Sequence, residues 1–145
     1  MAEIRHRIGV EAQIEDVYDA VATSKGVARW WTEDTGEDPG GAIGVTFGGA
    51  RAATMELAEQ TPPTHIVWRF VQGPAEWVGT TATFDLRRTG EETVLLFTHA
   101  GWAEPVEFMH HCSTRWGYFL LSLKHALEGA AANPWPHDEK ASTWG

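Results

Sequence analysis

The side chains most able to do chemistry are gathered between His99 and Gly129, in the stretch HAGWAEPVEFMHHCSTRWGYFLLSLKHALEG. Metal binding is the first chemistry to consider, because Glu107 stands three residues before His110 and four before His111. On a helix, either histidine would share one side with the glutamate. Adjacent histidines, however, point about 100° apart on a helix, and the stretch has neither an H-x-x-x-H pair nor a C-x-x-C pair. The sequence therefore predicts no metal site, and nothing in it indicates a cofactor.

Nucleophilic catalysis is the second chemistry. Cys112 would need a paired base, and its chain neighbour His111 is poorly placed to act as one. Cys112 also falls on an apolar stripe, where a buried thiol is usually inert. Neither Ser113 nor Ser122 lies in a G-x-S-x-G elbow. No catalytic motif is identified, and the sequence leans away from an enzyme.

Apolar residues in the same stretch recur at steps of three and four, which is typical of a helix with one buried face. Pro105 fits the first turn of this helix, and Gly129 fits its end. The stripe consists of Phe108, Cys112, Trp116, Phe119 or Leu120, Leu123 and Leu127. Because the stripe has helical spacing and the catalytic alternatives lack partners, we interpret the stretch as a helical wall.

Most of the remaining chain predicts strands joined by short links. Residues 3–10 alternate, with Ile4 and Ile8 on one side and Arg5 and Arg7 on the other. Further runs of strand length follow between turn residues. They are residues 42–47, 53–60, 64–71, 80–89 and 93–100. The links are too short for the crossover helices that parallel strands need, so we expect an antiparallel meander.

Residues 13–31 change to a helical period and predict short helices broken near Gly26. Residues 32–41 predict an acidic, turn-rich loop, and residues 130–145, interrupted by prolines, predict a surface tail. The expected fold class is α+β, with a curved antiparallel sheet of about six to seven strands gripping the long C-terminal helix. Two short helices follow the first strand. We expect residues 1–145 to form a single domain.

Composition narrows the classes of partner. The formal net charge of the 145-residue chain is −9, which disfavours nucleic acid because such binding depends on basic patches. We expect no membrane insertion, since no apolar run is long enough to span a bilayer and the chain opens without an export signal. The single Cys112 cannot form an internal disulfide, which fits a cytoplasmic protein. Eight tryptophans favour a tightly packed core or a lined cavity.

The order of elements and several motifs resemble the START-like superfamily of helix-grip proteins. Within it, the chain resembles the branch named after the activator of heat-shock protein 90 ATPase. The matching segments are EIRHRIGVEAQIEDVYDAV at 3–21, GVARWW at 26–31, Gly101-Trp102, WGYFLLSLKHALEG at 116–129 and NPWPHD at 133–138. The resemblance implies an apolar cavity between sheet and helix. Relatives of this fold include lipid or sterol carriers, polyketide cyclases and aromatases, and small-molecule sensors.

In a helix-grip fold, the apolar faces of strands and helix become the wall of the cavity, so their rings are candidates for ligand contact. The candidate rings are Trp68, Phe70, Phe84, Trp102 and Trp116. We expect His6, Arg69 and His99 to supply the polar groups that orient a ligand. The alternatives are that the rings form a solid core, that His6 is a hydrogen-bonded core or rim histidine, and that Arg69 forms an outward ion pair with Asp85.

The leading hypothesis is binding of a small hydrophobic or aromatic molecule in the cavity. The enzymatic alternative is a polyketide-cyclase/aromatase-like or hydrolase-like activity in the same cavity, with His99 or His6 as acid or base. A second alternative, suggested by the name of the branch, is interaction with a chaperone. A homodimer is a further expectation, because tryptophans of the tail could cover a neighbouring copy.

Overall fold

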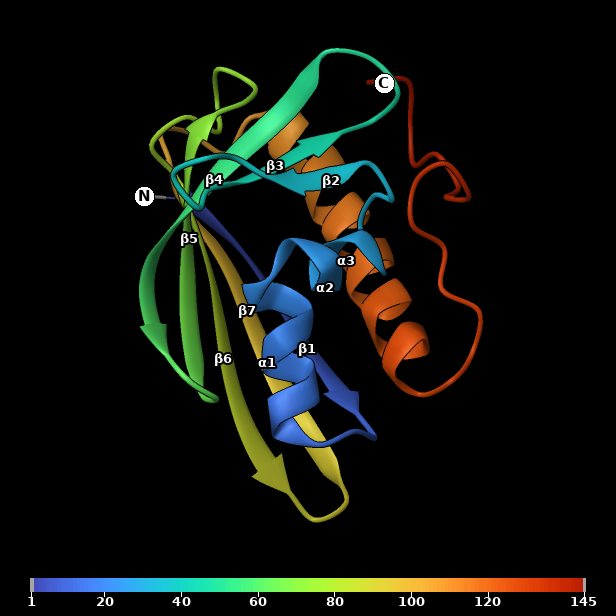
Figure 1. Ribbon diagram of the computed structural model, residues 1–145. Coiled ribbons are helices and arrows are strands. Elements are labelled where there is room, and N and C mark those ends of the chain that lie inside the picture. The colour runs from blue at the N-terminus through green and yellow to red at the C-terminus, as the bar shows by residue number, and fades with distance from the viewer. Residues whose placement is uncertain (1, 145) are drawn as a thin grey trace.

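The computed structural model describes residues 2–144 as a seven-stranded antiparallel sheet wrapped around one long helix (Figure 1). The strands are β1 (Ala2–Val10), β2 (Thr35–Glu37), β3 (Ile43–Thr46), β4 (Arg51–Thr61), β5 (His65–Gln72), β6 (Thr81–Thr89) and β7 (Glu92–Trp102). The helices are α1 (Ile14–Ala22), α2 (Ser24–Ala28) and α3 (Glu107–Leu127). The predicted α+β helix-grip class, with two short helices after the first strand, is confirmed.

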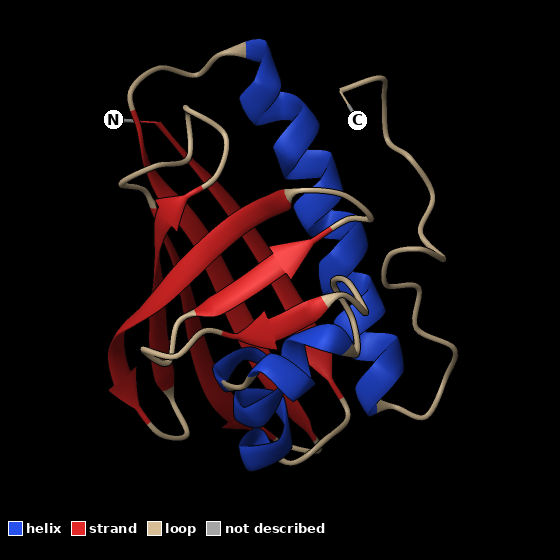
Figure 2. Ribbon diagram, turned by 45° about the horizontal axis from the view of Figure 1, so that its top comes forward, coloured by secondary structure: helices blue, strands red, loops and turns tan. Residues whose placement is uncertain are grey.

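The sheet has the order β1-β7-β6-β5-β4-β3-β2. Consecutive strands pair as hairpins from β2 to β7, and β1 pairs with β7 at the far edge. The sheet curves, and α3 crosses its concave side while α1 and α2 cover one end (Figures 1 and 2). This arrangement leaves the other face of the sheet to solvent, as the alternating sequences require.

Burial follows the predicted periodicity. On β5, Ile66, Trp68 and Phe70 are fully buried on the concave face, whereas Arg69 is exposed on the other. The predicted stripe on α3 faces the core, because Cys112, Trp116, Phe119, Leu120 and Leu123 are all buried. Burial of such side chains contributes about 1.5–3 kcal/mol each, so these two faces dominate the stability of the fold.

Two local predictions differ from the structure. The short helices break at Thr23, whose side chain caps α2 by accepting a hydrogen bond from the Gly26 amide (2.9 Å). Gly26 itself lies inside α2, where a Cβ atom would collide with the carbonyl oxygen of Asp19. The segment predicted as an acidic loop contains the short edge strand β2, which pairs with β3. Neither feature has the apolar period that reveals longer elements.

The tail beyond α3 lies along the helix instead of leaving the molecule (Figures 1 and 2). Trp135 forms a parallel bridge with Thr32, in which its amide donates to the Trp31 carbonyl (2.9 Å) and its carbonyl accepts from the Glu33 amide (3.0 Å). The Asn133 amide donates to Ser122 Oγ (3.0 Å). Among residues 2–144, no helix is long and apolar enough to cross a membrane.

Candidate functional site

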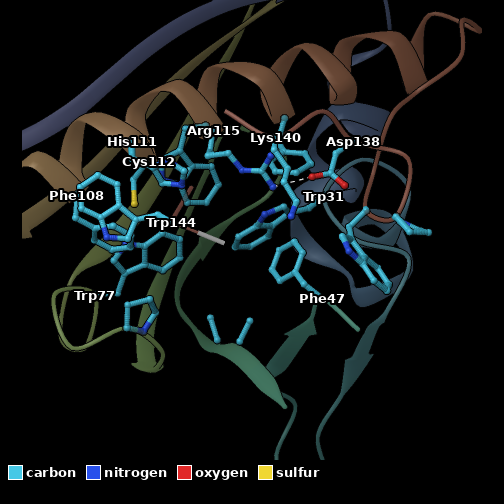
Figure 3. A pocket seen from close by; sticks show the side chains of 17 residues that line it. Trp31, Phe47, Trp77, Phe108, His111, Cys112, Arg115, Asp138, Lys140 and Trp144 are labelled. Atoms are coloured by element: carbon cyan, nitrogen blue, oxygen red, sulfur yellow. Dashed lines mark hydrogen bonds and ion pairs between the residues drawn. The ribbon is translucent and has the colours of Figure 1, made fainter. Parts of the chain in front are cut away.

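A pocket of about 530 Å³ lies between α3, the tail and the β2–β4 end of the sheet (Figure 3). The residues from α3 are Phe108, His111, Cys112, Arg115, Trp116 and Phe119. The tail contributes Trp135, Pro136, Asp138, Lys140 and Trp144. The sheet, its loops and the segment after α2 add Trp31, Phe47, Ala52, Ala53, Pro74 and Trp77. Three parts of the chain that are distant in sequence therefore enclose one space.

Tryptophan rings from α3 and from two connections form a continuous cluster along the pocket. Trp77 and Trp116 stack nearly parallel, with ring centroids 5.8 Å apart and planes 14° apart. Trp31 lies 5.0 Å from Trp116 and stacks on Trp68 behind it, at 5.8 Å and 6°. Because flat rings with few rotatable bonds line the space, its shape is set before any ligand enters.

His99 holds this wall from behind. The indole Nε1–H of Trp116 donates to His99 Nδ1 (3.1 Å), and an indole nitrogen can only donate. His99 therefore carries its proton on Nε2 and donates it to Thr80 Oγ (2.8 Å). Thr80 in turn donates to the carbonyl of Trp77 (2.6 Å), so one chain of hydrogen bonds ties both stacked tryptophans together.

The environment of His99 keeps its imidazole neutral. The side chain is fully buried, and the rings of Phe70, Trp77 and Trp102 lie about it with centroids at 5.0–5.3 Å. Burial lowers the pKa of His99 to about 3, because the charged form would lose its hydration. His99 does not line the pocket, and it acts on the pocket through Trp116 and Trp77.

Arg115 is the central polar residue of the pocket. Its Nη2 forms an ion pair with Asp138 Oδ2 (2.8 Å), and its Nη1 donates to the carbonyl of Glu139 (2.8 Å). The guanidinium carbon lies 4.6 Å from the centroid of the Phe119 ring, in cation–π geometry. These contacts hold the tail against α3 and place a positive charge at the pocket (Figure 3).

Cys112 and His111, two titratable residues of α3, also border the pocket. Burial raises the pKa of the Cys112 thiol to about 12, and the neighbouring Trp77 indole offsets part of this rise. Within residues 2–144, the Trp77 N–H has no hydrogen-bond acceptor. Burial and the nearby Arg115 lower the pKa of His111, whose Nδ1 contacts Ser142 Oγ. A protonated thiol is a poor nucleophile, so this part of the pocket offers hydrogen bonding instead of covalent chemistry.

The five rings proposed from the sequence occupy different places. Trp116 lines the pocket. Trp68, Phe70, Phe84 and Trp102 lie outside its lining, each at most 1% exposed, and fill the space between the sheet and α3. Trp68 supports the pocket indirectly by stacking on Trp31. The space beneath the middle of the helix is thus packed with side chains, and the open volume lies toward the tail.

The polar residues proposed from the sequence lie outside the pocket lining as well. His6 Nε2–H donates to the carbonyl of Ser113 (3.1 Å), which fixes β1 to α3. Arg69 is exposed on the opposite face of the sheet. The alternative considered for Arg69, an ion pair with Asp85, is wrong as well, because the strand register places Asp85 opposite His65, whose Nδ1 lies 2.6 Å from Asp85 Oδ1.

Most of the pocket residues were not found from the sequence. Trp31, Phe47, Trp77 and Trp135 lie on connections and on the tail, at or beyond the ends of the periodic runs, so the period did not mark them as pocket residues. The excess of tryptophan was the available signal, since rings on loops need a recess to be buried. Within residues 2–144, no group of three or more histidine, cysteine or acidic side chains could hold a metal ion.

The family model of activator of Hsp90 ATPase homolog 1-like proteins matches residues 11–128. A solved relative, the Aha1 dimer from Colwellia psychrerythraea, is 37% identical to the chain, covers 88% of it and 97% of its own length, and has a TM-score of 0.79. The chain belongs to this family. The expected membership of the START-like, helix-grip superfamily is thereby confirmed. The matched range ends at residue 128, before the tail that supplies five pocket residues.

Other structures with the same fold are more distant in sequence. BH1534 from Bacillus halodurans is 18% identical over 88% of this chain and 98% of its own, with a TM-score of 0.69. CalU16 from Micromonospora echinospora is 18% identical over 97% of this chain and 75% of its own, with a TM-score of 0.74. These similarities show the helix-grip fold of the family. No curated protein matches the chain.

Proposed function

We propose that this protein binds a small, planar, largely aromatic molecule in the pocket between α3, the tail and the sheet. The observation that supports this proposal most strongly is the lining of the pocket: eight aromatic side chains border a volume of about 530 Å³. They are Trp31, Phe47, Trp77, Phe108, Trp116, Phe119, Trp135 and Trp144. A volume of roughly 300–1,000 Å³ with mostly apolar walls and few polar groups is typical of small-molecule sites.

Preorganisation of the wall supports binding. The hydrogen bonds from Trp116 through His99 and Thr80 to the Trp77 carbonyl hold two stacked rings at the site. A ligand that stacks on them would not have to immobilise them, and that cost is about 0.5–1.5 kcal/mol for a side chain with many rotamers. The same contacts favour binding over turnover at His99, because its side chain is fully buried, does not line the pocket and has both ring nitrogens in hydrogen bonds.

The proposal is tested by titrating the protein with neutral aromatic compounds of two to four fused rings and following heat or tryptophan fluorescence. We expect saturable binding, and an Ala52→Phe variant should weaken it at least tenfold because the new ring occupies the pocket. Ala58→Phe is the matched control, since Ala58 is exposed on the same strand and does not line the pocket. No binding across the series, or equal binding by both variants while far-UV circular dichroism shows them folded, would contradict the proposal.

We also propose that the chain forms a homodimer. The support is its 37% identity to the Aha1 protein from Colwellia psychrerythraea, whose solution structure is a dimer. Analytical ultracentrifugation between micromolar and hundred-micromolar concentration tests this, because a self-associating chain sediments faster as concentration rises. A single species of about 16.0 kDa across the whole range would contradict it.

A further inference from the structure

We propose that the ligand is a planar aromatic carboxylic acid and that Arg115 binds its carboxylate. This inference rests on the proposed function, because it names the chemical class that the same pocket selects. It follows from the unused hydrogen-bonding capacity of Arg115, the charges around the pocket and the ring on which the guanidinium lies.

Arg115 has donors to spare at the pocket. A guanidinium presents five N–H groups, and within residues 2–144 two of them donate, one to Asp138 and one to the Glu139 carbonyl. The Arg115 side chain is only 18% exposed, so water reaches it poorly. In the described part of the chain, none of the Arg115 nitrogens is both fully buried and without a partner, so a ligand oxygen can reach its remaining donors and accept charge-assisted hydrogen bonds from them.

The charges at the pocket favour an anion. Two cationic side chains, Arg115 and Lys140, border it, against the single carboxylate of Asp138. Within residues 2–144, Lys140 forms no ion pair. His111 adds no negative charge in either protonation state. The lining therefore carries one net positive charge, on a chain whose formal net charge is −9.

The geometry favours a carboxylate attached to a ring. A planar carboxylate matches the fork of a guanidinium and can accept two parallel hydrogen bonds. The Arg115 guanidinium carbon lies over the Phe119 ring, 4.6 Å from its centroid, and Trp31 and Trp116 also line the pocket. A ring carrying the carboxylate would stack on these side chains while its charge meets Arg115 (Figure 3).

The test compares 2-naphthoate with its neutral amide, 2-naphthamide, by isothermal titration calorimetry at pH 7. Both present the same two fused rings, and only the acid carries a charge. We expect the acid to bind at least tenfold more tightly than the amide. The preference should disappear in an Arg115→Gln, Asp138→Asn double variant, which removes both charges and leaves two amides able to pair with each other.

Two further variants make the result specific. Asp138→Asn alone should raise the affinity for 2-naphthoate several-fold, because Asp138 repels the ligand and competes for the same guanidinium. Arg69→Gln makes the same charge change as Arg115→Gln on the exposed face of the sheet, and should leave the preference for the acid intact.

The outcomes separate this inference from the proposed function. Equal affinity for acid and amide, with binding still blocked by Ala52→Phe, overturns the carboxylate inference and leaves the aromatic pocket standing. A preference for the acid that survives the double variant also overturns the role of Arg115. Failure of both compounds, together with failure of the neutral aromatic series, overturns the proposed function itself.

Discussion

His99 is enclosed by aromatic rings, yet both of its ring nitrogens have hydrogen-bond partners. The sequence placed His99 among candidate ligand contacts, with an acid or base role as an alternative. In the structure it orients Trp116 and, through Thr80, the backbone of Trp77. A buried polar group with complete hydrogen bonding specifies one arrangement of its neighbours, because any other leaves donors unmet.

Replacing His99 with Leu should therefore destabilise the protein. The variant leaves the Trp116 indole N–H without an acceptor and removes the donor to Thr80, and each unmet buried group costs about 1–3 kcal/mol. We expect the free energy of unfolding to fall by about 2–4 kcal/mol, measured by urea denaturation. His110→Ala is the control, because the His110 side chain is exposed. Its replacement should change the free energy of unfolding by less than about 0.5 kcal/mol. Equal effects from the two variants would contradict the assigned role.

Because His99 is buried in its neutral form, we expect the free energy of unfolding to depend on pH. An unfolded histidine titrates near pH 6.5, whereas the folded His99 has a pKa of about 3. Between these values the unfolded chain binds a proton that the folded chain excludes, so the free energy of unfolding falls as pH decreases. From pH 7 to 4.5, His99 should account for roughly 2–3 kcal/mol of the loss.

Chemical denaturation of wild type and His99→Gln at the two pH values measures this contribution. The variant should lose less stability on acidification than wild type, while His110→Ala should match wild type. The contribution of His99 is refuted if wild type and His99→Gln have the same difference between pH 7 and pH 4.5.

The division of the rings shows what sequence patterns convey at the residue scale. Alternation on the strands correctly placed Trp68, Phe70 and Phe84 on the inner face. It could not tell a packed interior from an open one, because both require inward apolar side chains. Which rings border open space depends on how far α3 and the tail stand from the sheet. That distance is set by contacts such as Arg115 with Asp138, between residues 23 positions apart.

At the scale of elements, the tail is a structural part of the pocket. It is joined to the segment after α2 by the bridge at Trp135, and to α3 by Arg115 and by the Tyr118 hydroxyl, which accepts from the Glu139 amide (3.0 Å). The Trp135 ring lies over the turn between β3 and β4. An added Cβ atom at Gly48 would be only 2.5 Å from its Cζ2.

Gly48→Ala should therefore loosen the tail. Gly48 has φ +81°, a conformation that costs other residues roughly 1–2 kcal/mol, and the new methyl group would also displace Trp135. We expect a loss of about 2 kcal/mol in the free energy of unfolding and weaker binding of aromatic probes. The adjacent Gly49 is a matched control, since it has ordinary φ and nothing within 4 Å of an added Cβ atom.

Thermal denaturation and calorimetric titration of Gly48→Ala and Gly49→Ala make the comparison. Gly49→Ala should retain both stability and binding. If Gly48→Ala were as stable as Gly49→Ala and bound the probes equally well, the contact of Trp135 with this turn would not be what holds the tail in place.

Long elements were predictable and short ones were not. Each of the six strands and the long helix predicted from hydrophobic period has a counterpart, and their ends shift by a few residues. The three-residue strand β2 has no such period, since Thr35, Gly36 and Glu37 are all polar or lack a side chain. The position of Gly26 inside α2 reflects close approach to Asp19, a tertiary contact that a local pattern does not contain.

At the scale of the whole molecule, the family model matches most of the chain but not the tail that borders the pocket. The family match covers residues 11–128, which hold the sheet from β2 onward and all three helices. Resemblance in the sequence was sufficient to predict this framework and a cavity bordering α3. It located the cavity beneath the helix, whereas the pocket lies where the tail from residue 130 meets α3, because large rings fill the space under the middle of the helix.

This division predicts how backbone hydrogen exchange will differ across the molecule. The ladder from Thr81 paired with Ala100 to Thr89 paired with Glu92 lies in the interior of the sheet and should exchange slowest. Within residues 2–144, none of the amides from 140 to 144 donates a hydrogen bond, so these should exchange at once. The amides of Asn133, Trp135 and Glu139 have single acceptors outside the sheet and should be intermediate.

Adding 2-naphthoate should change this pattern only at the pocket. A ligand held between Arg115 and the aromatic rings favours the closed tail, so exchange at residues 133–139 and at Glu33, which donates to Trp135, should slow at least tenfold at saturation. The strands β6 and β7 should slow only as far as the ligand raises global stability. Mass-spectrometric exchange of wild type and Arg115→Gln, Asp138→Asn, with and without the compound, makes the measurement. Uniform slowing of exchange along the chain in both proteins would contradict this prediction. It would mean that the tail opens only when the whole protein unfolds.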